Sequence, residues 1–171
     1  MKKVCFFGPE STGKSFLAER LACAYDTEFV PEVAREVITS SKFTIEDIIR
    51  VGQMQTTRVK LREKTANKIL ICDTDLITTQ IYSRQYLGVV PQELFELEKQ
   101  IRYDLYFLFD IDVPWTPDGL RDLGHKRKEM YEIFRNELVK RRIAFIPVNG
   151  SFDQREALVK SEIDNLIGTR P

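Results

Sequence analysis

Residues Gly8 to Ser15 read Gly-Pro-Glu-Ser-Thr-Gly-Lys-Ser, which is a complete phosphate-binding loop of the pattern G-x-x-x-x-G-K-[ST]. The loop directly follows the apolar run 4–7 and opens an amphipathic stretch over residues 16–25. In this strand, loop and helix context, successive backbone N–H groups surround a phosphate and the helix presents its positive end to it. The stretch therefore predicts a site for a nucleoside triphosphate.

The residue types of the loop have separate chemical reasons. Gly8 and Gly13 supply backbone conformations that a side chain would block. Lys14 would bring a catalytic ammonium group to the phosphate being transferred, and the Ser15 hydroxyl would bind Mg²⁺, the expected metal partner of ATP. We expect ATP to be bound by these residues, by their neighbours and by one distant arginine: Gly8, Glu10, Ser11, Thr12, Gly13, Lys14, Ser15, Phe16 and Arg127.

The alternation of apolar runs and helical periodicity predicts the fold class. Five apolar runs lie at 4–7, 28–30, 69–72, 105–111 and 144–148, and most are continuous, as in strands buried on both faces of a parallel sheet. Segments with helical periodicity fill the gaps between them. This predicts an α/β three-layer sandwich with a five-stranded parallel sheet, a P-loop fold of the nucleoside-kinase or nucleotide-kinase kind. At 171 residues we expect a single domain over 1–171.

Composition limits the partners. The 26 basic and 26 acidic side chains cancel, so no net field favours nucleic acid or a membrane surface, and we expect small-molecule partners only. No apolar segment is long enough to span a membrane and the Met-Lys-Lys start leads into a strand, so we expect a cytoplasmic protein. The three cysteines show no C-x-x-C spacing, which argues against a zinc site. Nothing in the chain indicates the oligomeric state.

Two acidic residues follow the apolar run 69–72. Asp73 ends this predicted strand, where a carboxylate can hold the metal ion or its water opposite Ser15. Asp75 lies two residues further on. It would either contact the substrate or serve as the N-cap of the helix that begins at Leu76, and the sequence does not decide between these roles.

Glu32 follows the second apolar run, at the sheet edge where acceptor-binding groups collect in α/β kinases. A carboxylate within hydrogen-bond reach of an acceptor hydroxyl can serve as general base, and Arg35 lies one turn later as a second substrate-binding candidate. The alternative is that these residues form the first turn of a helix, in which Glu32 interacts favourably with the positive end of the helix dipole and Arg35 is an ordinary surface charge. The general base remains open among Glu32, Asp73 and Asp75.

A long polar connection, 112–128, is the predicted lid. It begins with turn-forming residues, includes Trp115 and Arg121, and ends in a basic run at 125–128, although a solvated helix start is the alternative. Arg121 and Arg127 are candidate lid cations that would stabilise charge on the moving phosphoryl group, and Arg121 is the better catalytic candidate because it follows a turn. Trp115 would either stack on a heterocycle or pack against the sheet edge.

Together these motifs resemble the ribosylnicotinamide kinase domain of the NadR-type proteins of bacterial NAD salvage, over roughly residues 3–167. The more specific features are Glu32 with Arg35 and Glu36, the block 73–80, and Trp115 followed by the block 118–124. The resemblance implies transfer of the γ-phosphoryl group of ATP to the 5′-hydroxyl of nicotinamide riboside, which gives nicotinamide mononucleotide. It also implies a nucleotide-binding role for Lys14 and Ser15, a metal-associated role for Asp73, a lid arginine at Arg121, and a place for Trp115 where an aromatic could meet the nicotinamide ring. We expect substrate contacts at Glu32, Arg35, Asp75, Trp115 and Asp118.

The chain also departs from the bifunctional relatives, which carry an adenylyltransferase domain upstream and in some cases a DNA-binding helix-turn-helix. This chain begins at the phosphate loop, and its only histidine, His125, cannot supply the paired histidines of a nucleotidyltransferase. We therefore expect neither adenylyltransferase activity nor operator binding. Two alternatives stay open: another nucleoside or small-molecule P-loop kinase, and a regulatory ATPase without an acceptor. Whether ATP or GTP is preferred is also open.

Overall fold

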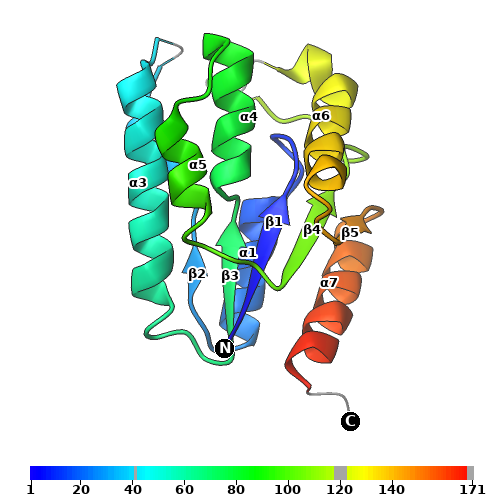
Figure 1. Cartoon of the computed structure of the whole chain (residues 1–171). Helices are drawn as coiled ribbons and strands as arrows, with labels where there is room; N and C mark the ends of the chain where they lie inside the picture. Colours follow the sequence, from blue (N-terminus) through cyan, green and yellow to red (C-terminus); the bar gives the residue numbers. More distant parts are fainter. Residues whose placement is uncertain (41, 118–122, 169–171) are drawn as a thin grey trace.

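A computed structural model describes residues 1–40, 42–117 and 123–168. Its centre is one parallel sheet with the strand order β2-β3-β1-β4-β5 (Figure 1). The strands are Lys2–Phe7 (β1), Phe29–Val30 (β2), Ile69–Asp73 (β3), Leu105–Phe109 (β4) and Phe145–Val148 (β5). The predicted parallel sheet and α/β sandwich are confirmed. The fourth strand is shorter than predicted, because the Ile111 N–H donates to the Asp110 carboxylate instead of to a neighbouring strand.

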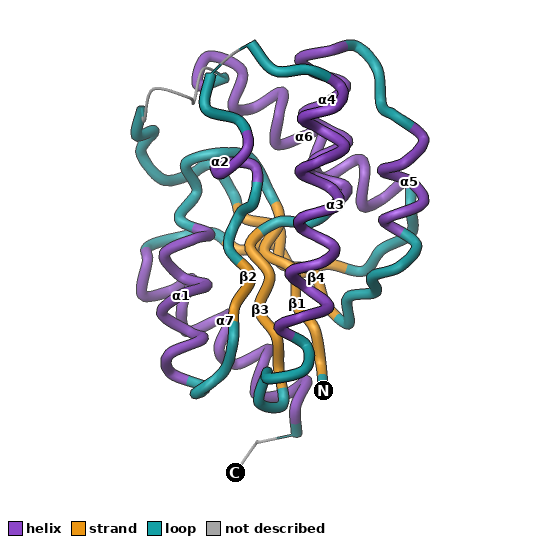
Figure 2. Tube along the Cα trace, turned by 90° about the vertical axis from the view of Figure 1, so that its left-hand side faces the viewer, coloured by secondary structure: helices purple, strands orange, loops and turns teal. Residues whose placement is uncertain are grey.

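Helices cover both faces of this sheet, as Figure 2 shows. The helices are Lys14–Ala24 (α1), Ala34–Val37 (α2), Ile45–Arg62 (α3), Leu76–Leu87 (α4), Gln92–Glu98 (α5), Arg127–Lys140 (α6) and Phe152–Ile167 (α7), with a 3-10 turn at Gly124–Lys126. The alternation of side chains along β1 explains the layers. Val4 and Phe6 pack against α1 and α7, whereas Cys5 and Phe7 pack against α4 and α6.

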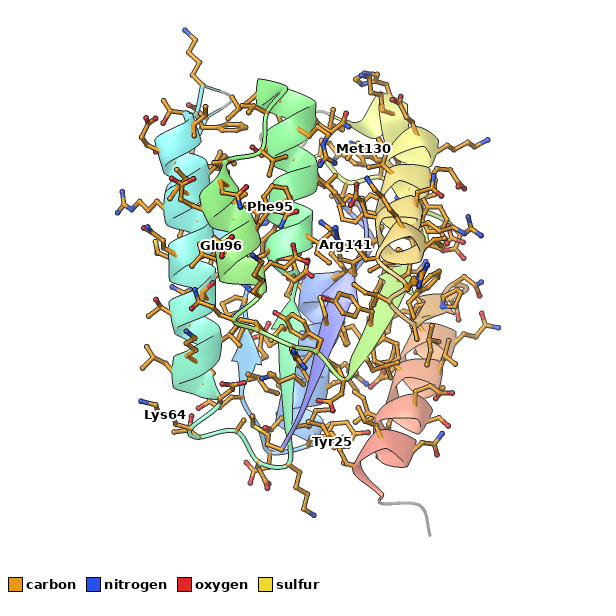
Figure 3. The ribbon with its side chains drawn as sticks, viewed as in Figure 1. Tyr25, Lys64, Phe95, Glu96, Met130 and Arg141 are labelled. Atoms are coloured by element: carbon orange, nitrogen blue, oxygen red, sulfur yellow. The ribbon has the colours of Figure 1, made fainter. Side chains whose placement is uncertain are left out.

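Local signals set the helix ends. Thr44 and Asp47 form a capping box at the start of α3, and Ser151 and Gln154 form one at the start of α7. Helix α4 ends at Gly88, which has a positive φ of 70° that glycine adopts without strain. Arg141, which is labelled in Figure 3, follows α6. It donates to the Gln80 Oε1 on α4 at 2.7 Å and so joins two helices that cover the same face of the sheet.

The parallel arrangement gathers the carboxyl ends of all five strands at one edge, where ligands bind in open α/β sheets. The phosphate loop follows β1 there, and its first residue must be glycine. Gly8 has φ +137°, and a Cβ at this position would lie 2.8 Å from the carbonyl oxygen of Phe109. Within the described ranges, no helix is long and apolar enough to cross a membrane.

Candidate active site at the phosphate loop

A cavity of about 200 Å³ lies at the carboxyl edge of the sheet. It brings together the phosphate loop, the residues after β2, and the start of α4, which are far apart in the sequence. Its lining consists of Gly8, Glu10, Ser11, Thr12, Gly13, Lys14, Ser15, Phe16, Glu32, Arg35, Thr74, Thr78 and Tyr82. The predicted phosphate-binding residues and the predicted acceptor-side pair Glu32 and Arg35 therefore share one cavity.

The loop is held in shape by its own side chains. The Thr12 hydroxyl donates to the Pro9 carbonyl oxygen at 3.1 Å, and the Lys14 ammonium donates to the same carbonyl at 2.6 Å and to the Thr12 Oγ1 at 3.3 Å. Gly13 has φ +83° immediately before α1 begins. Lys14 is only 8% exposed, so its charge lies within the loop and close to the position that a phosphate would occupy.

Asp73 lies at the carboxyl end of β3 and is 1% exposed. Neither of its carboxylate oxygens has a hydrogen bond of normal geometry within the described residues. Burial raises its pKa to about 6, while the nearby Lys14 ammonium and Ser15 hydroxyl lower it and Glu32 raises it. A buried carboxylate whose oxygens have no hydrogen bond of normal geometry within the described residues, next to a serine hydroxyl, fits the hard oxygen donors that Mg²⁺ prefers.

Protein side chains alone do not form a closed metal site here. Among the residues that the structure describes, no group of three or more His, Cys, Asp or Glu side chains could hold an ion. This agrees with the chemistry of Mg²⁺, which keeps several waters and is bound by one or two protein groups plus the phosphates of a nucleotide. Ser15 and Asp73 are thus candidates to hold Mg²⁺ together with ATP.

Glu32 and Arg35 form an ion pair on the acceptor side of the cavity, with 3.1 Å between Arg35 Nε and Glu32 Oε2. The Glu32 side chain is 22% exposed, so it is accessible from the cavity without being fully solvated. Glu36 points elsewhere and pairs with both terminal nitrogens of Arg58 on α3. Glu32 therefore lies in the cavity with its carboxylate held by Arg35, and Glu36 does not line that cavity.

Asp75 has a different environment. It is 2% exposed and caps α4: its Oδ1 accepts from the Thr78 N–H at 2.9 Å and from the Thr78 hydroxyl at 3.1 Å. Its Oδ2 accepts from the Tyr106 hydroxyl at 2.9 Å. Asp75 does not line the cavity, so the structure favours the N-cap alternative over the substrate contact.

The described part of the predicted lid contacts the phosphate loop. The Arg127 guanidinium donates to the carbonyl oxygens of Val113 at 2.8 Å and Ser11 at 3.3 Å, and the Thr116 N–H donates to the Ser11 hydroxyl at 2.8 Å. Val113 and Thr116 also line a second cavity of about 370 Å³, together with Ser11, Thr12, Gly13, Leu17, Phe109, Pro114, Phe152 and Arg155.

Trp115 lies in neither lining. The Arg127 guanidinium carbon is 5.6 Å from the Trp115 ring, and a Cβ on Gly124 would lie 2.8 Å from that ring, so the tryptophan packs inside its own segment. This arrangement favours packing over stacking on a substrate. Asp118 and Arg121 lie outside the described residues, so their predicted roles stay predictions.

Three cavity residues were not predicted as site residues, namely Thr74, Thr78 and Tyr82. Tyr82 lies one helical turn after Thr78 on α4, and burial together with the nearby Glu10 and Glu32 carboxylates holds its pKa well above the ordinary value. The signal that could have found Thr78 and Tyr82 is their i, i+4 spacing on α4, whereas Thr74 lies before the helix and directly follows Asp73.

Known structures share this fold. A crystal structure of NadR protein in complex with NR has a TM-score of 0.80 and 26% identity, and covers 99% of this chain and 52% of that one. NadR protein in complex with NAD and AMP-PNP has a TM-score of 0.81 and 24% identity, with coverage of 99% and 50%. A deoxyadenosine kinase from M. mycoides, with a TM-score of 0.69 and 14% identity over 95% of this chain and 99% of that one, shares the fold alone.

Sequence relatives agree. The trifunctional NAD biosynthesis/regulator proteins NadR of Escherichia coli (strain K12) and Salmonella typhimurium (strain LT2) are 32% and 31% identical to the chain over 158 residues. That match covers 86% of this chain and 38% of each relative, so the chain spans well under half of their length. The predicted similarity to the NadR kinase domain is confirmed. The family model for the AAA domain matches residues 3–155, and the chain belongs to that family.

Proposed function

We propose that this chain is an ATP-dependent kinase that phosphorylates the 5′-hydroxyl of nicotinamide riboside and so forms nicotinamide mononucleotide. The observation that carries the proposal is the shared cavity, in which the phosphate loop faces Glu32 and Arg35. A kinase needs this arrangement because the donor phosphate and the acceptor hydroxyl must meet in one enclosed space. The similarity to NadR, one structure of which holds NR, supports nicotinamide riboside as the acceptor.

Residues of the phosphate loop and Asp73 would bind ATP and Mg²⁺. The loop N–H groups and Lys14 would bind the β- and γ-phosphates, and Lys14 would exchange its bond to the Pro9 carbonyl for a bond to phosphate. Ser15 and Asp73 would hold Mg²⁺, which neutralises charge on the phosphates when it is bound. Phe16 and Arg127 lie beside the loop and complete our proposed donor side.

On the acceptor side, Glu32 would accept the proton of the 5′-hydroxyl of the riboside as the hydroxyl oxygen attacks the γ-phosphorus of ATP. The bond between that phosphorus and the oxygen that bridges it to the β-phosphate breaks, and ADP leaves. Arg35 would orient the Glu32 carboxylate through their ion pair. The Thr78 and Tyr82 side chains line the same cavity and would orient the riboside. Asp73 would be occupied by the metal ion, which leaves Glu32 as our choice of base.

A panel of ribosides with ADP release as the readout tests the proposal. The panel contains nicotinamide riboside, deoxyadenosine, adenosine and cytidine, each with Mg²⁺ and ATP, and a reaction without acceptor. We expect slow release without acceptor and turnover of roughly 1 to 100 per second with nicotinamide riboside, as for other kinases. Faster turnover with another nucleoside would reassign the acceptor. Hydrolysis that no riboside stimulates would favour a regulatory ATPase instead.

A further inference from the structure

A buried arginine, Arg155, lies behind the phosphate loop. It belongs to the first turn of α7 and is only 2% exposed, although charged side chains are rarely buried unless they are paired. Its guanidinium carbon lies 5.9 Å from the ring of Phe109 in β4. Arg155 is not part of the phosphate-loop motif, and neither the proposed chemistry nor the sequence motifs give it a role.

The partners of Arg155 come from three separate segments. Its Nε–H donates to the Gly150 carbonyl at 2.9 Å, its Nη1 to the Thr12 carbonyl at 2.9 Å, and its Nη2 to the Asp110 carbonyl at 3.2 Å and to the Asp112 carboxylate. Four of the five N–H donors of the guanidinium group are therefore used on protein atoms. Arg155 acts on the loop, and little of its donor capacity is left for a ligand.

The contact with Thr12 follows from the geometry of an anion-binding loop. When successive backbone N–H groups turn inward toward a phosphate, the carbonyl groups between them turn outward and need their own donors. Arg155 supplies the donor at Thr12, and Arg127 supplies the donor at Ser11. Two guanidinium groups thus hold the outer side of the loop from α7 and α6.

The same arginine connects the loop to the predicted lid segment. Asp112 is the first residue of that segment, and its carboxylate accepts from Arg155 and, through Oδ2, from the Gly150 N–H at 2.6 Å. Arg155 and Asp112 therefore join the ends of β4 and β5 to the phosphate loop at one point. Because the Asp112 carboxylate neutralises the charge of Arg155, the arginine fixes the geometry of the phosphate loop more than it adds positive potential to the nucleotide site.

We infer that Arg155 is a positioning residue of the nucleotide site, which holds the phosphate loop in its anion-binding shape and couples it to residues 110–112 and 150. The inference deepens the proposed function and rests on it, because it assumes that the loop binds ATP. Loss of Arg155 should weaken nucleotide binding selectively, since its contacts lie on the donor side and none of them reaches Glu32 or Arg35.

The test compares Arg155→Met and Arg155→Lys with the unaltered protein. Affinity for the Mg²⁺ complex of a non-hydrolysable ATP analogue is measured by calorimetry, and KM is measured for ATP and for nicotinamide riboside. We expect Arg155→Met to weaken nucleotide binding roughly 10- to 100-fold, the effect of losing a hydrogen bond to a charged group, with the KM of nicotinamide riboside changed by less than about 3-fold. Arg155→Lys keeps the positive charge but loses the planar set of guanidinium donors, so its nucleotide affinity should lie between those of Arg155→Met and the unaltered protein.

Two further variants make the result specific. Asp112→Asn removes the charge partner and leaves the bond to Thr12, so we expect a smaller loss of nucleotide affinity than for Arg155→Met. Arg62→Met breaks an exposed ion pair with Glu28 at the opposite edge of the sheet and should leave nucleotide affinity unchanged. Thermal unfolding shows which variants are folded. If Arg155→Met is unfolded, the nucleotide affinity of Arg155→Lys is compared with that of the unaltered protein instead.

The possible outcomes distinguish a failure of the role inferred for Arg155 from a failure of the proposed kinase function. Folded Arg155 variants that bind the analogue as tightly as the unaltered protein would overturn the inference and leave the proposed function intact. Equal increases in KM for ATP and nicotinamide riboside would overturn it as well, since they would indicate general support of the fold. If the unaltered protein itself binds no nucleotide, the proposed function fails and the inference fails with it.

Discussion

Replacing Asp75 with asparagine should make the protein more stable at neutral pH than the unaltered chain. Asp75 is fully enclosed, and its carboxylate is bonded to Thr78 and Tyr106. Burial raises its pKa from 3.8 to about 6, and the hydrogen bonds from Thr78 and Tyr106 only partly offset this effect. Asparagine is also a good N-cap, and its amide can accept from the Thr78 N–H and donate to the Tyr106 oxygen.

The size of the effect follows from the pKa. Each tenfold change in proton affinity corresponds to about 1.4 kcal/mol, so a rise from 3.8 to about 6 corresponds to about 3 kcal/mol. Because the folded protein binds this proton more tightly than the unfolded chain, ionisation of Asp75 costs stability as the pH rises from about 4 through about 6. Above that window the cost is complete, and below about pH 4 it disappears. Asp75→Asn removes it at every pH.

Urea unfolding followed by circular dichroism, at several pH values from 4.5 to 8, measures this difference. We expect the free energy of unfolding of Asp75→Asn to exceed that of the unaltered protein by up to about 3 kcal/mol at pH 8 and by much less at pH 4.5. Taking the difference between the two proteins cancels the titration of Asp73, which both contain. A difference that stays constant over this pH range would refute the argument that burial dominates the ionisation of Asp75. Asp75→Ala, which leaves the Thr78 N–H and the Tyr106 hydroxyl without their partner, should be less stable than Asp75→Asn at each pH.

Three further predictions concern activity. Lys14→Ala should reduce turnover at least about 100-fold, by analogy with loss of one charge-stabilising donor, with an unchanged circular dichroism spectrum; retained ADP release would remove Lys14 from the mechanism. The value of kcat/KM for MgATP should fall as the pH drops below about 6, because Asp73 of the free protein must ionise before it can hold Mg²⁺ and burial raises its pKa to about 6; in Asp73→Asn that acidic limb should vanish while the Mg²⁺ concentration needed for half-maximal rate rises, and an unchanged limb would assign it to another group. Trp115→Ala should raise KM for ATP and nicotinamide riboside by similar factors, since the ring packs against Gly124 and Arg127; a selective rise for nicotinamide riboside would instead support a contact with the nicotinamide ring.

The sheet and the phosphate loop could be predicted because their signals are local. A continuous apolar run before Gly8 and another before Asp73 indicate buried parallel strands, and parallel strands bring the residues after them to one edge. The loop motif then fixes the positions of Lys14 and Ser15. These inferences need only residues that are neighbours in the sequence and the rule that the carboxyl ends of parallel strands lie at the same edge of a sheet.

Roles that depend on distant partners could not be predicted in the same way. An aspartate before a helix fits both an N-cap and a ligand, and the choice for Asp75 depends on the Tyr106 hydroxyl from β4. Arg155 has the sequence surroundings of an ordinary surface arginine on a helix, yet three chain segments converge on it. Only the three-dimensional arrangement supplies these contacts.

Transfer of a labelled γ-phosphoryl group from ATP tests the central claim most directly. The protein is incubated with Mg²⁺ and ATP labelled in that group, with and without nicotinamide riboside, and the products are separated by chromatography. We predict that the label appears in nicotinamide mononucleotide when the riboside is present and stays mainly in ATP when it is absent. Label released only as inorganic phosphate, at the same rate in both reactions, would contradict the proposed kinase.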